Sequence, residues 1–165
     1  SYRKPQISKS QVNVISPQTS YQILNILEGA IIRGTGKALN SIKYPLAGKT
    51  GTTNDSKDLW FFGLTPKFVV GVYVGYDTPK KIGYKETGSS IALPIFKSFV
   101  EDYLDNNLVI DQDDFFIPNN LILKKIDYKT GDFVNNNDSI FEFFTKEQLE
   151  TIDNLNKVND IGGIN

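Results

Sequence analysis

The chain has 165 residues, enough for one domain, and it contains no histidine, cysteine or methionine. Without histidine and cysteine, Ser-His-Asp and Cys-His catalysis, disulfides and the common zinc sites are excluded, so any chemistry must use lysine, carboxylates, hydroxyls or backbone groups. The net charge of −1 hides an asymmetry: residues 1–100 have 13 basic and 5 acidic residues, a net +8, whereas residues 101–165 have 5 basic and 14 acidic ones, a net −9. The basic part suits an anionic substrate, and scattered lysines with only two arginines argue against nucleic-acid binding.

Two helices and three strands are predicted before residue 105. Ser16 is a good N-cap, Pro17 suits the first helical position, and apolar residues then recur at intervals of three and four, which predicts a helix over 17–33. The segments around Lys49, DLWFFGLT and FVVGVYVGY are strand-like and separated by short turns, which predicts an antiparallel meander. Because the two later strands are apolar on both faces, we expect a sheet covered on both sides, with the aromatic residues of WFF in the core. A second helix is predicted over 90–104.

The chain changes character after residue 105. Residues 106–165 are acidic and rich in asparagine, which divides the chain into residues 1–105 and a C-terminal tail, residues 106–165. In the tail we expect a hairpin near 127–133 and a short helix from Thr145, and the asparagine runs favour partial disorder.

The motif Gly48-Lys49-Thr50-Gly51-Thr52-Thr53 has two functional interpretations. A phosphate-binding P-loop needs glycine where Lys43 stands and a long helix after the lysine, and the sequence favours neither. The alternative is a Lys-Thr-Gly motif on a strand beside a serine nucleophile. There the lysine supplies positive charge, threonine hydroxyls bind a substrate carboxylate, and Gly51 leaves room for a peptide along the strand edge. Lys129-Thr130-Gly131 repeats the triplet, but its setting between two short strands predicts a turn.

The surrounding sequence carries further motifs in a fixed order. Over about residues 13–100 these are S-P-Q-T, R-G-T-G, A-G-K-T-G-T-T-N-D, D-L-W-F-F-G-L-T-P, V-G-V-Y-V-G-Y-D, E-T-G and P-I-F. This stretch closely resembles the transpeptidase domain of bifunctional class A penicillin-binding proteins. The resemblance implies a D,D-transpeptidase that cross-links peptidoglycan stem peptides ending in D-Ala-D-Ala through an acyl-serine intermediate and is acylated by β-lactams. It also implies a parent protein anchored in the bacterial inner membrane, facing the periplasm and carrying a glycosyltransferase, with no metal or organic cofactor.

The resemblance also assigns roles to the motif residues. Lys49 would organise the proton network of the active site, and Thr50 and Thr52 would bind the terminal carboxylate of the stem peptide or β-lactam. The backbone N–H of Thr52 would form half of the oxyanion hole, and Gly51 would let the acyl chain approach. The implied fold is α+β, the C-terminal portion of a penicillin-binding-protein/β-lactamase-like fold. Its three antiparallel strands and flanking helices would leave a sheet incomplete, so self-association is expected.

Two motifs that the family requires are missing or misplaced. Ser-x-Asn does not occur, and Ser-x-x-Lys occurs once, as Ser1-Tyr2-Arg3-Lys4, in a polar stretch broken by Pro5, which we interpret as a coincidence. The absence of methionine agrees with an excised piece of a longer protein, a processed chain being the alternative. We therefore expect the chain alone not to be acylated by penicillin. A non-catalytic peptide- or partner-binding module is the alternative function, and the two upstream motifs in the parent reading frame would decide between them.

Overall fold

The computed structural model describes residues 12–106, 114–135 and 139–162, so the Ser1-x-x-Lys4 sequence lies outside the described residues. Three one-turn segments, η1 (Lys37–Leu39), η2 (Asn54–Ser56) and the π-helical η3 (Gly88–Ala92), lie between the longer elements. The described helices are all too short or too polar to cross a membrane. In chain order the longer elements are α1 (Pro17–Ile32), β1 (Ala47–Thr52), β2 (Asp58–Leu64), β3 (Val69–Gly75), α2 (Leu93–Asn106), β4 (Ile122–Asp127), β5 (Ser139–Phe144) and α3 (Lys146–Gly162).

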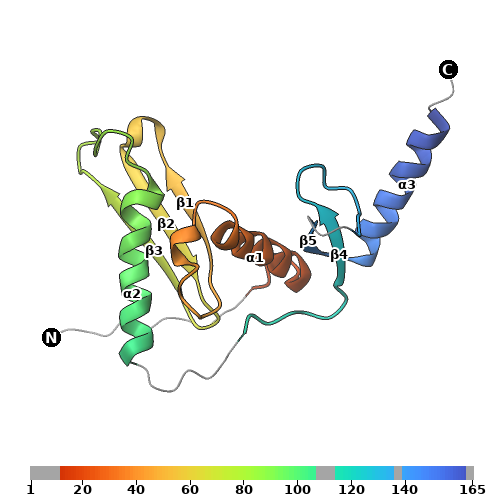
Figure 1. The fold of residues 1–165 in the computed structure, drawn as a ribbon, viewed down its shortest axis with the longest axis horizontal. Helices are drawn as coiled ribbons and strands as arrows, with labels where there is room; N and C mark the ends of the chain where they lie inside the picture. Colours follow the sequence, from red (N-terminus) through yellow and green to blue (C-terminus); the bar gives the residue numbers. More distant parts are fainter. Residues whose placement is uncertain (1–11, 107–113, 136–138, 163–165) are drawn as a thin grey trace.

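Helix α1 forms where the capping signal predicts it. The Ser16 hydroxyl accepts a hydrogen bond from the Thr19 N–H at 3.1 Å, and Pro17 occupies the first turn, where its missing N–H costs nothing. α1 lies beside β1, between the sheet and the β4–β5 hairpin (Figure 1). The helix therefore contacts both parts of the chain.

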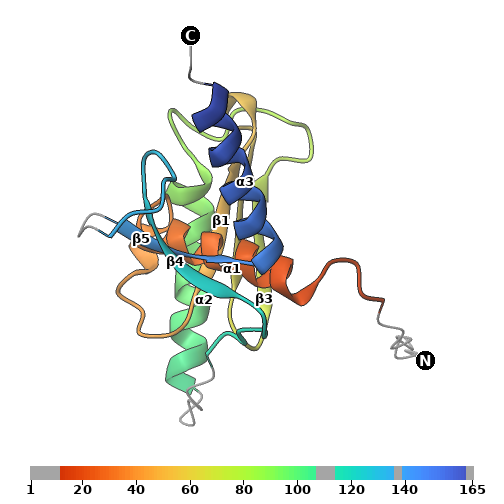
Figure 2. The ribbon, with the colours of Figure 1, turned by 90° about the vertical axis from the view of Figure 1, so that its right-hand side faces the viewer.

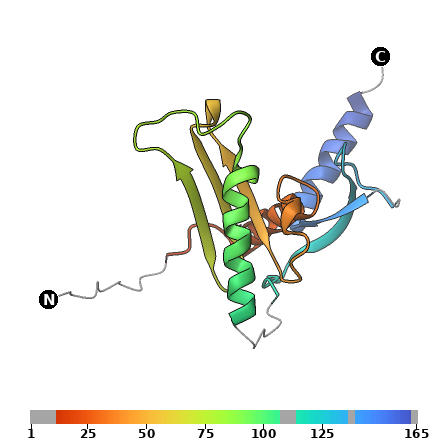
Figure 3. The same ribbon diagram turned by 60° about the vertical axis from the view of Figure 1, so that its left-hand side comes forward.

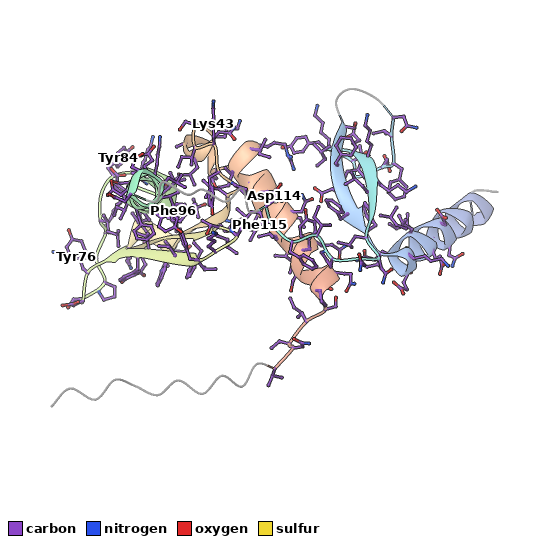
Figure 4. The ribbon with its side chains drawn as sticks, turned by 90° about the horizontal axis from the view of Figure 1, so that it is seen from below. Lys43, Tyr76, Tyr84, Phe96, Asp114 and Phe115 are labelled. Atoms are coloured by element: carbon purple, nitrogen blue, oxygen red, sulfur yellow. The ribbon has the colours of Figure 1, made fainter. Side chains whose placement is uncertain are left out.

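The first three strands form an antiparallel sheet in the order β1-β2-β3, which confirms the predicted meander. Helix α2 lies across one face of this sheet (Figure 3). On that face Leu59 and Phe61 are fully buried, and the ring centroid of Phe61 lies 5.0 Å from that of Phe96. Phe96 projects from α2 toward the strands (Figure 4), and the core of the molecule is centred there.

The opposite face of the sheet is open, so the expectation that both faces are covered is wrong for the described residues. Trp60 and Phe62 on β2 and Tyr73 on β3 are 36%, 48% and 48% exposed, and only Phe61 of the three consecutive aromatic residues is in the core. The exposed rings pack on one another instead, Trp60 against Phe62 at 5.5 Å and against Tyr73 at 4.6 Å. An apolar pattern indicates that a sheet face is suited to packing, but it does not show which segment packs on that face.

The second predicted helix is confirmed and begins earlier than residue 90. Thr87 caps η3 through a hydrogen bond from the Ser90 N–H, and Leu93 N–H donates to the Gly88 carbonyl in the wide π pattern. Pro94 follows directly, and a proline inside a helix supplies no N–H and crowds the carbonyl four residues before it. The helix therefore widens at η3 before α2 continues with regular geometry.

The C-terminal tail forms a small unit against α1. β4 and β5 pair as a two-stranded antiparallel sheet, and a bridge between Ile126 and Phe133 confirms the tight hairpin predicted near 127–133. α3 starts after Thr145 as expected, but with 17 residues it is longer than the short helix that was predicted. Viewed from the side of the tail, β4, β5 and α3 lie in front of α1 (Figure 2). Asparagine runs near 107 and 136–137 lie outside the described residues.

Candidate functional site

The predicted site residues lie on β1, the edge strand of the three-stranded sheet. Thr53 N–H donates to the Asp58 carbonyl at 3.0 Å, which fixes the alternation of the ladder with β2. In an antiparallel pair, residues bond to the partner strand alternately, so the N–H groups of Thr50 and Thr52 point away from β2. No strand of the described residues pairs with this edge of β1, and this free edge therefore presents the Thr52 N–H that an oxyanion hole would need.

Lys49 and Thr50 lie next to each other on this edge but face opposite sides of the sheet. The exposed Lys49 ammonium donates to the Thr50 carbonyl at 2.8 Å. The Thr50 hydroxyl lies 2.9 Å from that of Thr35, which follows α1 in the R-G-T-G segment. No role was predicted for Thr35, although R-G-T-G is one of the motifs in residues 13–100 that resemble the family.

The hydroxyl of Thr52 has a partner from a distant part of the chain. Gly88 N–H, at the start of η3, donates to Thr52 Oγ1 at 3.0 Å. A hydroxyl has one O–H and two acceptor positions, so a hydroxyl that accepts this bond keeps its own proton for another acceptor. Thr52 is exposed, and its O–H is therefore available to a ligand at the strand edge.

Gly51 separates the two threonines and faces the open side of the sheet. Its register partner is Trp60, just as the partner of Lys49 is Phe62, so these side chains share a face. A Cβ added at Gly51 would lie 3.1 Å from the Cβ of Trp60, a tight but tolerable contact. Glycine thus leaves the backbone uncovered beside an exposed aromatic surface.

Hydrogen bonds of Thr53 and Asp58 hold the turn after β1 in place. Thr53 Oγ1 accepts the Asp58 N–H at 2.8 Å, and Asp58 Oδ1 accepts the Tyr73 hydroxyl at 2.8 Å. The hydrogen bond to Asp58 raises the pKa of the Tyr73 hydroxyl above its usual value. Asp58 therefore links the turn after β1 to β3.

The second Lys-Thr-Gly triplet lies far from β1, in the turn between β4 and the Phe133 bridge. Asp127 Oδ1 accepts the N–H groups of Lys129 and Thr130 at 2.7 and 3.0 Å, and Gly131 adopts a positive φ of 80°. This confirms the predicted turn. The P-loop interpretation fails on geometry, because a strand surrounds Lys49 and another strand, not a long helix, follows it.

Comparisons with known proteins agree with this arrangement. Residues 1–101 match the family described as penicillin binding protein transpeptidase domain. The chain is similar to proteins named Penicillin-binding protein 1A: 42% identical over 90% of the chain in Rickettsia prowazekii, and 46% identical over 50% of it in Pseudomonas aeruginosa. It covers 19% and 10% of those two proteins.

A solved structure extends the similarity to the fold. The crystal structure of Penicillin-Binding Protein 1A from Haemophilus influenzae superposes with a TM-score of 0.70 at 30% identity, over 81% of this chain and 21% of that one. The Rickettsia prowazekii alignment spans 150 residues and so continues well into the tail beyond the 101 family-matched residues. The expected α+β fold is confirmed, and the chain belongs to the penicillin-binding protein transpeptidase domain family.

Proposed function

We propose that this chain supplies the Lys-Thr-Gly strand of a peptidoglycan D,D-transpeptidase whose nucleophile lies in another part of a longer protein. The observation that carries the proposal is the free edge of β1, where the Thr52 N–H, two threonine hydroxyls and a lysine lie within four consecutive residues. The substrates are stem peptides ending in D-Ala-D-Ala, and β-lactams acylate the same serine.

Each group on the edge has a part in the acyl transfer. The hydroxyls of Thr50 and Thr52 bind the terminal carboxylate, and charge-assisted hydrogen bonds of this kind are the stronger ones. The Thr52 N–H stabilises the oxyanion of the tetrahedral intermediate, a contribution typically of about 3–4 kcal/mol. Lys49 supports proton transfer at the serine and leaving group, and Gly51 keeps space for the acyl chain.

The parent protein would also carry the glycosyltransferase and a membrane anchor, and would work on the periplasmic face of the inner membrane. Proteins named Penicillin-binding protein 1A among the relatives support this assignment. Within the chain, residues 1–105 would be the end of the transpeptidase domain, and residues 106–165 a tail packed on α1. In the isolated chain, the open sheet face would favour self-association.

A fluorescent penicillin tests the proposal on two proteins, the isolated chain and the longer protein that contains it. We expect covalent labelling of the longer protein at a serine outside these residues, and none of the isolated chain. Lys49→Ala should slow labelling by at least about a hundredfold, as expected for loss of a preorganised charge. Labelling of the isolated chain would overturn the assignment of the nucleophile.

The alternative, a non-catalytic module that binds a peptide, gives a different result. The longer protein would then take up no covalent label, yet would bind an acyl-D-Ala-D-Ala peptide with an affinity that falls in Lys49→Ala. This outcome would support peptide binding at the edge of β1 and would contradict the acyl-transfer function.

A further inference from the structure

Gly88 packs directly on the backbone of the Lys-Thr-Gly strand. A Cβ added at Gly88 would lie 2.7 Å from the Gly51 carbonyl oxygen, 3.2 Å from the Gly51 nitrogen and closer still to the Trp60 carbonyl oxygen. Real Cβ contacts at such distances with backbone atoms are not tolerated without movement. Gly88 is buried and lies over the hydrogen-bonded pair formed by Gly51 and Trp60.

This close approach brings the Gly88 N–H to the hydroxyl of Thr52. The donor and acceptor are 3.0 Å apart, and they lie 36 positions apart in the chain. Because the hydroxyl accepts from Gly88, its own proton is directed away from η3 and is free to be donated. The hydrogen bond thus selects the rotamer and the proton direction that a carboxylate at the strand edge would require.

The segment that carries Gly88 is itself held in place. Thr87 and Ser90 form a capping box, in which each side chain accepts the backbone N–H of the other residue, at 3.2 and 2.9 Å. The Ser90 hydroxyl also donates to Glu86 Oε2 at 2.6 Å. Behind them, Ala92, Leu93 and Phe96 are fully buried, so α2 fixes η3 to the core. Gly88 is therefore a rigid donor rather than a loop residue that happens to be near.

We propose that Gly88 is a positioning residue for Thr52: its amide sets the direction of the Thr52 O–H toward the substrate carboxylate, and only glycine allows the approach. This role rests on the proposed transpeptidase function, and it concerns the carboxylate of the substrate rather than the reacting carbonyl. Removing the donor should therefore weaken recognition of the carboxylate more than it disturbs acylation in general.

The test compares benzylpenicillin with its methyl ester, which lacks the charged carboxylate, as acylating agents of the longer protein. In Gly88→Ala we expect the acylation rate constant for benzylpenicillin to fall by about tenfold or more, the typical effect of losing one hydrogen bond to a charged group. The rate constant for the ester should change by less than about threefold, so the acid-to-ester ratio falls. A general loss of structure would lower both rates together.

Gly29→Ala on α1 is the matched control, because a Cβ there would meet only the end of the flexible Arg33 side chain, at 2.5 Å from its Nη2. It should leave the acid-to-ester ratio unchanged. In a Thr52→Val background, Gly88→Ala should lower the ratio no further, since the two changes break one interaction. An unchanged ratio in Gly88→Ala, in a protein that is still labelled, overturns the role of Gly88 alone. A wild-type protein that takes up no label overturns the transpeptidase function and this role with it.

If Gly88→Ala does not accumulate as folded protein, the contact is tested from the other side. Hydrogen exchange of the Gly88 amide in the longer protein should be faster in Thr52→Val than in wild type, and should return toward the wild-type rate in Thr52→Ser, which keeps the hydroxyl. Equal exchange in Thr52→Val and wild type would show that the hydroxyl does not hold this amide, and would overturn the proposal.

Discussion

Thr35 and Thr50 present two hydroxyls 2.9 Å apart beside the free edge of β1. Either oxygen can donate this hydrogen bond, so Thr50 is free to turn its own proton outward when Thr35 is the donor. Without Thr35, the Thr50 side chain would populate more rotamers in the absence of a ligand. The contact between the two side chains therefore restricts Thr50 in advance of binding.

Thr35→Val should slow acylation of the longer protein by penicillin about fivefold, corresponding to one lost neutral hydrogen bond of about 1 kcal/mol. The measurement is the second-order rate constant for labelling with fluorescent penicillin. Thr35→Ser keeps a hydroxyl at the same distance along the side chain and should recover most of the rate. A Val variant as fast as wild type would show that Thr50 needs no partner.

The position of the motif on a strand was predictable, whereas the partners of its side chains were not. Lys49, Thr50 and Thr52 lie within four residues of one another, and the Lys-Thr-Gly pattern together with the family resemblance predicted them on one strand, which is β1. Thr35 and Gly88 meet them only because α1 ends beside β1 and because η3 lies over the β1–β2 ladder. The R-G-T-G and E-T-G segments signalled importance, but a one-dimensional pattern does not show which atoms such glycines and threonines approach.

At the level of elements, Phe96 is one of the fully buried side chains that pack α2 into the core. Phe96 is fully buried, contacts Phe61, and fills the space that the missing side chain of Gly63 leaves on β2. Phe99, one turn further along the same helix, is 48% exposed and packs edge-on against Phe68 at 5.9 Å. The two phenylalanines therefore differ in burial while sharing a helix and a residue type.

Phe96→Ala should lower the free energy of unfolding by about 3–5 kcal/mol, because it removes buried surface and leaves a cavity against β2. Phe99→Ala should cost about 1 kcal/mol, in keeping with its partial exposure. Urea unfolding followed by circular dichroism measures both. Equal losses for the two variants would contradict the assignment of the core to the Phe96 side of α2.

Helix α1 joins the tail through contacts that include an acidic side chain in a partly buried setting. Gln22 Nε2 donates to the Phe143 carbonyl at 2.7 Å, Tyr21 packs edge-on against Phe143, and Glu142 lies 3.9 Å from Arg33. Burial raises the pKa of the Glu142 carboxyl, and the nearby Arg33 only partly offsets that effect. The folded state therefore holds a proton on Glu142 more tightly than the unfolded chain does.

A raised pKa makes the contribution of Glu142 largest below the ordinary glutamate range, and this contribution is lost as the pH rises through the folded-state pKa. Glu142→Gln should remove that decline, so its unfolding free energy should depend less on pH between about 4 and 7. Urea unfolding across this range measures the effect. Glu150→Gln, on the exposed side of α3, serves as the control and should follow the wild type. A Glu142→Gln curve parallel to wild type would contradict the burial of this carboxyl.

Sequence patterns predicted the elements of this fold better than their environment. The capping signal at Ser16 and the strand-like runs are local, so α1 and the meander were found with their approximate ends. Which segment packs on each face of the sheet depends on residues that are distant in the sequence. The pattern of β2 is apolar on both sides, yet α2 covers only the side of Leu59 and Phe61.

Considered as a whole, the chain has one sheet face that its described residues leave open. Trp60, Phe62 and Tyr73 form a stacked cluster there, and Val69 extends it at 64% exposure. Large exposed apolar patches are uncommon on monomers and usually mark a contact surface. In a longer protein of this family, further parts of the transpeptidase domain could pack on this open face of the sheet. In the isolated chain, a second copy is the available apolar partner.

The isolated chain should therefore self-associate at high concentration through this face. Trp60 is the only tryptophan, so its fluorescence reports the face directly, and its emission should shift to shorter wavelength as the concentration rises. Phe62→Lys places a charge within the cluster, next to Trp60, and should reduce both the shift and the weight-average mass in sedimentation equilibrium. Tyr128→Lys, at an aromatic position in the tail turn that is 65% exposed against 48% for Phe62, should leave both unchanged. Association that survives Phe62→Lys but is lost in Tyr128→Lys would place the contact on the tail, because only the tail hairpin carries Tyr128.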